Sequence, residues 1–262
     1  MQLTIVGASG SVSGPLSPAS SYLVQAPHQG RTFSLLLDLG PGSFGALYRY
    51  LDPSDVDAVA LSHLHPDHCV DLCGLYVAGR YAPTAPWSRI PVYGPVGTPE
   101  RLQRAYEVSG VCEPGLSIAE WFDHRVWAAE QVVGPFTVTT TRVAHPVEAY
   151  ALRISENSTG GGSLVYTGDT GPTPRLAELA QGADLLLSEA AFLTGPDNPP
   201  DLHLTGAQAA EIAEAADVGV LVLTHIPPWH DPERVQAEAR QVTRRPVELA
   251  ASGVRWSVGG SA

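Results

Sequence analysis

The sequence has 262 residues, of which 44% are hydrophobic and 16% are charged, a balance typical of a folded globular protein rather than a disordered chain. No window approaches the roughly 20 uninterrupted apolar residues of a membrane-spanning helix, and the N-terminal segment lacks the features of a secretion signal, so we expect a cytoplasmic protein without a membrane partner. The formal net charge of −12 disfavours a broad surface for nucleic acid, although it allows a small anionic substrate beside bound metals.

Short apolar runs alternate with amphipathic stretches along the whole chain, and no repeat or low-complexity linker divides it. We therefore expect a single domain over residues 1–262. Strands are predicted at residues 3–6, 21–26, 33–39, 56–63, 90–94, 135–143, 149–155, 163–168, 183–189 and 218–225. Helices are predicted at residues 43–51, 68–81, 98–109, 173–181, 205–216 and 231–241, the fifth with Thr205 as its N-cap.

The order of these elements indicates the fold class. Strand pairs that look like hairpins dominate the first third of the chain, and strands alternate with helices in the rest. This order favours an α/β fold in which two mixed β-sheets form a sandwich flanked by helices, an αββα arrangement, over a doubly wound sheet. The GASGS segment at residues 7–11 fits neither phosphate-loop pattern and is interpreted as a glycine turn.

A cluster of metal-binding side chains follows the apolar run at 56–63. The segment LSHLHPDHCVDL contains His63, His65, Asp67 and His68, and three of the chain's 9 histidines in six positions are hard to attribute to an ordinary polar loop. Because alternate residues of a strand share one face, His63 and His65 are expected to point at one metal. Asp67 and His68, in the following turn, are expected to face a second metal. Imidazole and carboxylate suit Zn²⁺ and also Mn²⁺ or Fe.

Four residues cannot fill two coordination shells, so further ligands must come from elsewhere in the chain. Three candidates stand directly after predicted strands: His145, Asp169 and His225. A single histidine at a strand end is more often structural than a ligand. The conjunction of these three residues with the cluster favours ligands.

These residues carry a family resemblance. HLHPDH, with His145, Asp169 and His225 in that order and Asp38 upstream in LLLDLGPG, resembles the metallo-β-lactamase superfamily over nearly the whole chain. The resemblance implies the metallo-β-lactamase fold and two divalent metal ions, Zn²⁺ first and Mn²⁺ or Fe as alternatives. It implies that the first metal is bound by His63, His65 and His145. It implies that the second is bound by Asp67, His68 and His225, with Asp169 bridging both ions and Asp38 supporting the site from behind the ligands.

Two later segments narrow the resemblance to one branch. ADLLLSEAAF and DLHLTGAQAAEIA are similar to segments of the ribonuclease Z branch and implicate Glu189 and His203. In that branch such a pair lies beside the metals and orients or protonates the leaving oxygen, although Glu189 alone is equally expected to hold His203 in place. The implied reaction is attack of a metal-bridging hydroxide on a phosphodiester, with Asp67 taking part in deprotonating the water and His203 acting as general acid.

The substrate is where the sequence departs from the ribonucleases. They carry a long substrate-gripping arm between the positions of His145 and Asp169, whereas the interval here is short and holds one basic residue, Arg153. Transfer RNA is therefore a poor candidate substrate. The segments GASGSVSGPLSPAS, SHLHPDHCVDL, PPDLHLTG and LTHIPPW resemble compact actinobacterial cyclic-nucleotide phosphodiesterases. That likeness implies hydrolysis of a small phosphodiester, a 3′,5′-cyclic nucleotide such as cAMP, to the 5′-monophosphate.

Alternatives stay open beside this interpretation. They are a ribonuclease Z-like tRNA 3′-processing endonuclease or other nuclease, a metal-dependent hydrolase of lactones or thioesters, and, remotely, a metal-binding protein without activity. Relatives of this type often pair into dimers, so a homodimer is one expected assembly.

Several other side chains near the motifs have competing interpretations. Three aromatic residues are candidates to stack on a nucleobase, although ordinary loop packing is the stronger expectation for each: Tyr81, Trp87 and Trp229. His230 lies five residues beyond His225, past two prolines, and is not included among the ligands. The cysteines are expected to be reduced and to have no role as ligands: Cys69, Cys73 and Cys112.

Overall fold

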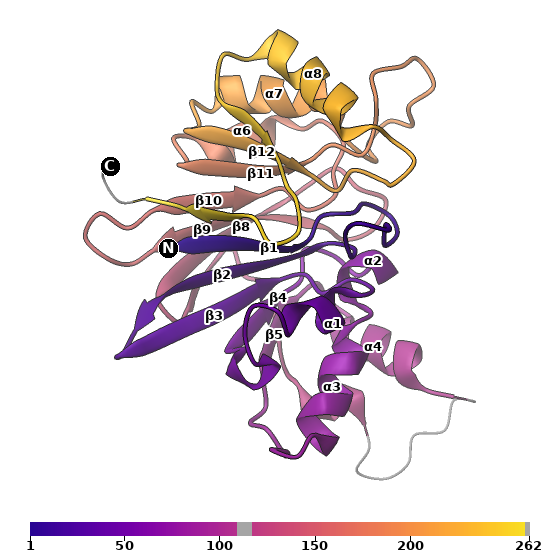
Figure 1. Cartoon of the computed structure of the whole chain (residues 1–262), viewed down its shortest axis with the longest axis vertical. Helices are drawn as coiled ribbons and strands as arrows, with labels where there is room; N and C mark the ends of the chain where they lie inside the picture. The colour runs from indigo at the N-terminus through magenta and orange to yellow at the C-terminus, as the bar shows by residue number, and fades with distance from the viewer. Residues whose placement is uncertain (109–116, 260–262) are drawn as a thin grey trace.

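The computed structural model describes residues 1–108 and 117–259 (Figure 1), so Cys112 lies outside the described residues. Within them the strands form two seven-stranded sheets. The first sheet contains, in spatial order, β14 (Arg255–Ser257), β1 (Gln2–Gly7), β2 (Ser21–His28), β3 (Arg31–Leu37), β4 (Ala58–Ala60), β5 (Pro91–Gly94) and β6 (Asp123–Val126). The second contains β13 (Val247–Leu249), β12 (Val220–Thr224), β11 (Leu185–Glu189), β10 (Ser163–Tyr166), β9 (Tyr150–Glu156), β8 (Phe136–Arg142) and β7 (Glu130–Val133).

Both sheets are mixed. In the first, β14, β1, β2 and β3 pair antiparallel, and β3 to β6 pair parallel. In the second, β13 to β10 pair parallel, and β10 to β7 pair antiparallel. As a result β3 and β4 run in one direction within their sheet, and β8, β10, β11 and β12 share one direction within theirs. The carboxyl ends of these strands provide the loops that carry the candidate site.

Helices cover the outer face of each sheet (Figure 1). Beside the first sheet are α1 (Ser43–Leu47), the 3₁₀ turn η1 (Pro53–Asp55), α2 (Pro66–Cys69), α3 (Leu72–Tyr81), α4 (Thr98–Tyr106) and α5 (Ile118–Trp121). Beside the second are α6 (Pro174–Ala180), α7 (Gly206–Ala215) and α8 (Pro232–Val242). The predicted αββα sandwich of two mixed sheets is thereby confirmed.

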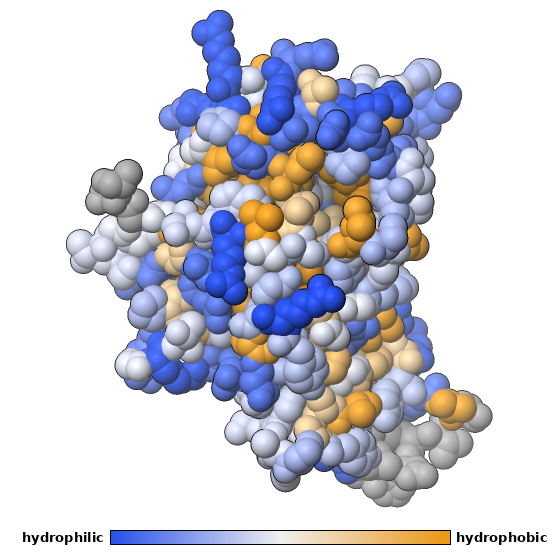
Figure 2. All heavy atoms as spheres, in the orientation of Figure 1, coloured by the Kyte–Doolittle hydropathy of each residue, from blue (hydrophilic) through white to orange (hydrophobic). Residues whose placement is uncertain are grey.

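The strands read as continuous apolar runs because both of their faces are buried. In β3, Leu35 and Leu37 enter the core between the two sheets, while Leu36 packs under the helices of the first sheet. In β11, Leu185 and Leu187 enter the same central core. One central core and two outer cores therefore hold the layers together. The face in Figure 2 is covered mostly by hydrophilic and near-neutral residues, with hydrophobic ones in groups between them.

The structure differs from the predicted elements at several places, which include the unpredicted α5 and η1. Strands β6, β7, β13 and β14 were not predicted; each lies at the edge of a sheet and is short and partly exposed, so it lacks an apolar run. The helix predicted at 68–81 is two helices, α2 and α3. The strand predicted at 56–63 is only Ala58–Ala60, so His63 lies in a loop.

The predicted cap of α7 is confirmed. The Thr205 hydroxyl accepts from the Gln208 backbone N–H at 3.2 Å, and the Gln208 side chain accepts from the Thr205 N–H at 2.9 Å, a capping box. This cap, two residues after His203, fixes the start of α7. No helix within the described residues is both long enough and apolar enough to cross a membrane.

Candidate metal centre

The candidate site lies where the strand ends of the two sheets meet. The first sheet supplies His63, His65, Asp67 and His68 from the segment after β4, and Asp38 from the end of β3. The second sheet supplies Glu189, the last residue of β11, and residues that follow β8, β10, β11 and β12: His145, Asp169, His203 and His225. Loops that are far apart in the sequence therefore place all of the candidate residues together at one edge of the sandwich.

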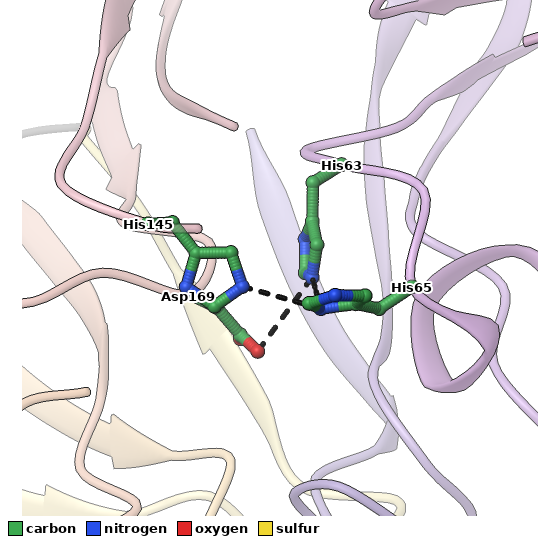
Figure 3. Close-up of side chains that lie close together, drawn as sticks. All are labelled: His63, His65, His145 and Asp169. Carbon is green, nitrogen blue, oxygen red and sulfur yellow. Dashed lines mark hydrogen bonds and ion pairs between the residues drawn. The ribbon is translucent and has the colours of Figure 1, made fainter. Parts of the chain in front are cut away.

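The first group contains three imidazoles and one carboxylate (Figure 3). His63 Nε2 lies 3.0 Å from His65 Nδ1, which lies 3.2 Å from His145 Nε2. Asp169 Oδ2 lies 3.7 Å from His63 Nε2. One donor atom from each of the four residues lies within 4.8 Å of the others, so the group could hold a metal ion. The expected convergence of His63 and His65 is present, but it comes from a loop and not from alternation along a strand.

The second group shares the Asp169 carboxylate with the first. Asp169 Oδ1 lies 3.2 Å from His68 Nε2, and its Oδ2 lies 3.3 Å from His225 Nε2. Asp67 Oδ2 lies 3.3 Å from His68 Nε2. These four residues could hold a second ion. Asp169 thus occupies the position expected of a bridging ligand, and the two groups contain the seven predicted ligands.

Hydrogen bonds on the outer nitrogens orient the rings. His145 Nδ1 donates to the Leu202 carbonyl at 3.1 Å, and His225 Nδ1 lies 2.9 Å from Ser20 Oγ. His63 Nδ1 lies 3.1 Å from Ser62 Oγ. Each contact leaves Nε2 facing the centre, the arrangement that metal-binding histidines generally show.

Asp38 lies behind His68. Its Oδ2 is 2.7 Å from His68 Nδ1, and the carboxylate also accepts from the Ser62 backbone and hydroxyl and from the Tyr166 hydroxyl, each at 2.7 Å. The residue is fully buried and has a φ of 56°, in the left-handed region that aspartate tolerates better than most residues. Asp38 therefore links the loop after β4 to β10 of the other sheet.

The pKa values show which rings hold a proton. Burial lowers the pKa of His63 well below its ordinary value and that of His145 to about 4, so both rings are neutral at pH 7. Burial alone would also lower the pKa of His68, but the Asp169 and Asp38 carboxylates raise it well above its ordinary value. A metal bound at Nε2 of His68 must therefore displace a proton.

Two buried atoms test whether these residues fit metal ions. His68 Nε2 and Asp169 Oδ1 are both inaccessible to solvent, and neither makes a hydrogen bond within the described residues. A buried polar atom that lacks a hydrogen bond costs about 1–3 kcal/mol. The two atoms lie 3.2 Å apart as an ion pair, and a cation bound to both would satisfy them. The donors are imidazole and carboxylate without thiolate, which suits Zn²⁺, Mn²⁺ or Fe. The residues therefore fit divalent metal ions.

Glu189 and His203 lie beside this centre. The Glu189 side chain is fully buried at the end of β11, and its Oε1 accepts from the Thr170 backbone at 2.8 Å and lies 2.9 Å from His203 Nδ1. His203 Nδ1 is also 4.0 Å from Asp169 Oδ2, while its side chain keeps 12% of its surface exposed. The two predicted residues are thus brought together next to the candidate ligands, with Glu189 fixing the ring of His203.

The GASGS turn is part of the site, which its sequence does not reveal. The Ser11 backbone N–H donates to His225 Nε2 at 3.3 Å, and a Cβ on Gly10 would lie 2.1 Å from the His225 carbonyl oxygen. Only glycine fits where the turn passes so closely over His225. Ser11 and Ser20 were missed because a serine in a glycine-rich turn, or one directly before a strand, carries no distinguishing signal.

The three aromatic residues that are candidates to stack on a nucleobase differ in exposure. Tyr81 and Trp229 are 60% and 64% exposed, whereas Trp87 packs beside α3 and donates from Nε1 to the Thr84 hydroxyl at 2.9 Å. His230 belongs to neither group of candidate ligands; it lines a separate cavity of about 340 Å³ with Pro227. Among the described cysteines, Cys69 is buried with a pKa raised to about 12 by that burial, and both Cys69 and Cys73 are free thiols.

Comparison with known proteins decides the family. The family model described as the beta-lactamase superfamily domain matches residues 34–226, a range that includes all ten candidate site residues from Asp38 to His225. The chain belongs to the β-lactamase superfamily. It is 46% identical over 260 residues to an uncharacterized protein of Mycobacterium leprae, covering 98% of this chain and 89% of that protein. It is 32% identical over 259 residues to the probable metallo-hydrolase YhfI of Bacillus subtilis, covering 98% and 99%.

Solved structures agree with this family assignment. The crystal structure of YhfI superposes with a TM-score of 0.83 at 29% identity, covering 99% of this chain and 98% of that one. Human tRNase Z, short form, and a diphosphatase of the PhnP family share the fold, with TM-scores of 0.73 and 0.75 and coverage of 97–99%. Ribonuclease BN of an Enterobacter species is 27% identical over 282 residues, covering 88% of this chain and 90% of that protein. The chain is thus a metallo-hydrolase of the ribonuclease Z-like branch of the superfamily.

Proposed function

We propose that this metallo-hydrolase is a two-metal phosphodiesterase that hydrolyses a small phosphodiester, with a 3′,5′-cyclic nucleotide such as cAMP as the preferred substrate. The observation that carries the proposal is the contact of Glu189 Oε1 with His203 Nδ1 at 2.9 Å, directly beside the candidate ligands. Hydrolysis of a phosphodiester releases a strongly basic alkoxide, which leaves faster when an acid protonates it. An imidazole held beside the reacting centre suits that role.

Two bound divalent ions would lower the pKa of a water molecule and neutralise charge on the phosphoryl oxygens. The protein's own groups manage the protons. Asp67, whose pKa is lowered by His68 and His225 despite burial, is an ionised carboxylate that can accept a hydrogen bond from the water and orient it. Burial alone would lower the pKa of His203, but the hydrogen bond and charge of Glu189 raise it, so the ring keeps a proton for the leaving oxygen.

The shape of the second sheet supports a small substrate. Nearly all of the chain between His145 and Asp169 forms β9, a hairpin turn and β10, with no inserted arm to hold an RNA. The basic residue in this interval, Arg153, donates to the carbonyls of Leu179 and Gln181 at 2.8 and 2.9 Å and so faces α6. Together with a net charge of −12, this arrangement favours a substrate that carries one or two phosphates over a polynucleotide.

A nuclease is the second candidate, and the likeness to ribonuclease BN favours it. Hydrolysis of lactones or thioesters has no comparable support: no relative named above favours a lactone, and a thioester releases a thiolate that leaves without the proton that His203 would supply.

A substrate panel on protein loaded with Zn²⁺ or Mn²⁺ tests the proposal. We expect hydrolysis of cAMP and of bis(p-nitrophenyl) phosphate, and loss of turnover on both in His65→Ala. His28→Ala, which removes a histidine from a strand of the first sheet away from the cluster, serves as the matched control and should retain activity. Efficient cleavage of a tRNA precursor without turnover of any cyclic mononucleotide or dinucleotide would overturn the proposal in favour of the nuclease.

A further inference from the structure

The segment that carries His203 is a loop closed at its base. It leaves β11 and returns to α7, and the Phe192 backbone N–H donates to the Leu204 carbonyl at 3.0 Å where the two ends meet. Phe192 and Thr205 form an isolated parallel bridge, and the Phe192 ring meets the His203 ring edge-on at 5.0 Å. The base of the loop is therefore fixed, and the position of His203 depends on where the preceding residues dock.

Those residues dock on Gly171. A Cβ at position 171 would lie 2.5 Å from Asp201 Cα and 2.9 Å from the backbone nitrogen and carbonyl carbon of Asp201. All three are backbone atoms, so no rotation of a side chain can relieve the contact. On its other side Gly171 donates from its backbone N–H to the Ala144 carbonyl at 2.7 Å. Gly171 is thus enclosed between the loop that precedes His203 and the segment that precedes His145.

The contact at Gly171 is connected to the candidate metal centre by the next two residues of the loop. Asp201 is followed by Leu202, whose carbonyl accepts from His145 Nδ1 at 3.1 Å, and then by His203 itself. A displacement of Asp201 would therefore move the proton donor and also the carbonyl that orients one candidate ligand. To reach an ordinary contact of 3.4 Å from a Cβ at position 171, the loop must move by about 1 Å.

We propose that Gly171 is a positioning residue: the absence of its side chain lets Asp201 dock so that His203 reaches the leaving oxygen while Leu202 orients His145. The proposal rests on the phosphodiesterase function proposed above. The proposal explains why the residue two positions after Asp169 is a glycine. The backbone of Gly171 forms an antiparallel bridge with Ala144, and such a bridge does not by itself require glycine.

Gly171→Ala tests the proposal with two substrates. On cAMP, whose leaving alkoxide needs a proton, turnover should fall by about 10- to 100-fold, since a misplacement of 1 Å can cost that much. On bis(p-nitrophenyl) phosphate, whose leaving group is a much weaker base, turnover at saturating Zn²⁺ should change by less than about threefold. Zn²⁺ affinity, measured by competition with a chelator, should fall by about tenfold because the Leu202 carbonyl no longer orients His145. Gly45→Ala is the control, since a Cβ there in α1 meets nothing within 4 Å.

A second pair of variants tests the same contact from the loop side, at an exposed position where a substitution is less damaging to folding. Asp201 has a φ of 55°, which a β-branched residue resists and glycine adopts freely. Asp201→Val should therefore reproduce the selective loss on cAMP, and Asp201→Gly should keep wild-type turnover on both substrates.

The outcomes separate the two proposals. If the wild-type protein hydrolyses neither phosphodiester, the proposed function fails. If it hydrolyses both, and Gly171→Ala and Asp201→Val match Gly45→Ala in cAMP turnover, Gly171 does not position His203. Unchanged Zn²⁺ affinity in a folded Gly171→Ala protein would overturn the link to His145 whatever the activity.

Discussion

His68 Nδ1 lies 2.7 Å from Asp38 Oδ2, although His68 belongs to α2 and Asp38 follows β3, 30 positions earlier, and both side chains are fully buried. On the other edge of the same ring, Nε2 lies 3.2 Å from Asp169. The His68 ring is thus held between Asp38, which supports it, and Asp169, which belongs to the same group of candidate ligands.

Replacing Asp38 with alanine should weaken both folding and metal binding. The Ser62 backbone and hydroxyl, His68 Nδ1 and the Tyr166 hydroxyl would all lose their acceptor. We expect a loss of about 3 kcal/mol or more in the free energy of unfolding and a 10- to 100-fold loss in metal affinity. Urea unfolding and chelator competition measure the two effects. Asp52→Ala, which removes a carboxylate from the surface turn η1, should leave metal affinity unchanged; an equal loss there would contradict the role of Asp38.

Removing metal should destabilise the protein. The Asp67 and Asp169 side chains are buried. Once the metal is removed, the two carboxylates face each other and the imidazoles without a cation between them. At a metal concentration 100-fold above Kd, binding contributes about 2.7 kcal/mol of stability. Melting curves with a chelator, and after adding Zn²⁺ back, should therefore differ by several degrees. The shift should shrink in His65→Ala, and identical curves with and without the chelator would argue against a metal site.

His203→Ala should lower turnover while leaving the metals in place. The ring lies beside the centre but is hydrogen-bonded to Glu189, and its Nδ1 is 4.0 Å from Asp169. Loss of a general acid should reduce cAMP hydrolysis by about 10²- to 10⁴-fold. Elemental analysis of the purified variant should show wild-type metal content. Loss of metal in this variant would mean that His203 is a ligand.

Glu189→Gln should shift the pH dependence of turnover. Burial alone would lower the pKa of His203, and the Glu189 carboxylate raises it above its ordinary value. The acid works only while protonated, so activity that depends on it is lost as pH rises through that pKa. Without the negative charge the pKa falls, and the alkaline limb of the kcat profile for cAMP should move to lower pH. An unshifted limb would show that another group titrates there.

The inner strands could be predicted from the sequence because burial on both faces leaves an unbroken apolar signature. Leu185, Leu186 and Leu187 alternate between the central core and the outer core, and all are apolar. The edge strands carry no such signature. In β6 the residues are half-buried or exposed, and its pairing with β5 depends on tertiary position.

The candidate site could be assembled from the sequence only in part. The cluster in HLHPDH indicated a site for two metals, and positions directly after predicted strands indicated the distant candidates His145, Asp169 and His225. The resemblance then assigned them to metals, but no pattern in the chain encodes the distances between them. Tyr166 falls within a predicted strand, and only the structure shows that its hydroxyl reaches Asp38 across the central core. The role of Gly171 could not be predicted either, because a glycine near a strand end is common and the sequence does not show which part of the chain touches it.

The location of the candidate ions between the two sheets has a mechanical consequence. One sheet provides His63, His65, Asp67 and His68, and the other provides His145, Asp169 and His225, so neither layer holds a complete set of donors. Bound ions would hold the two sheets together at this edge, and any sliding of one sheet over the other would open both coordination shells at once. Loops at the opposite edge of the sandwich can change length without disturbing the candidate metal centre, whereas the loops at the strand ends around the centre cannot change length without moving its ligands.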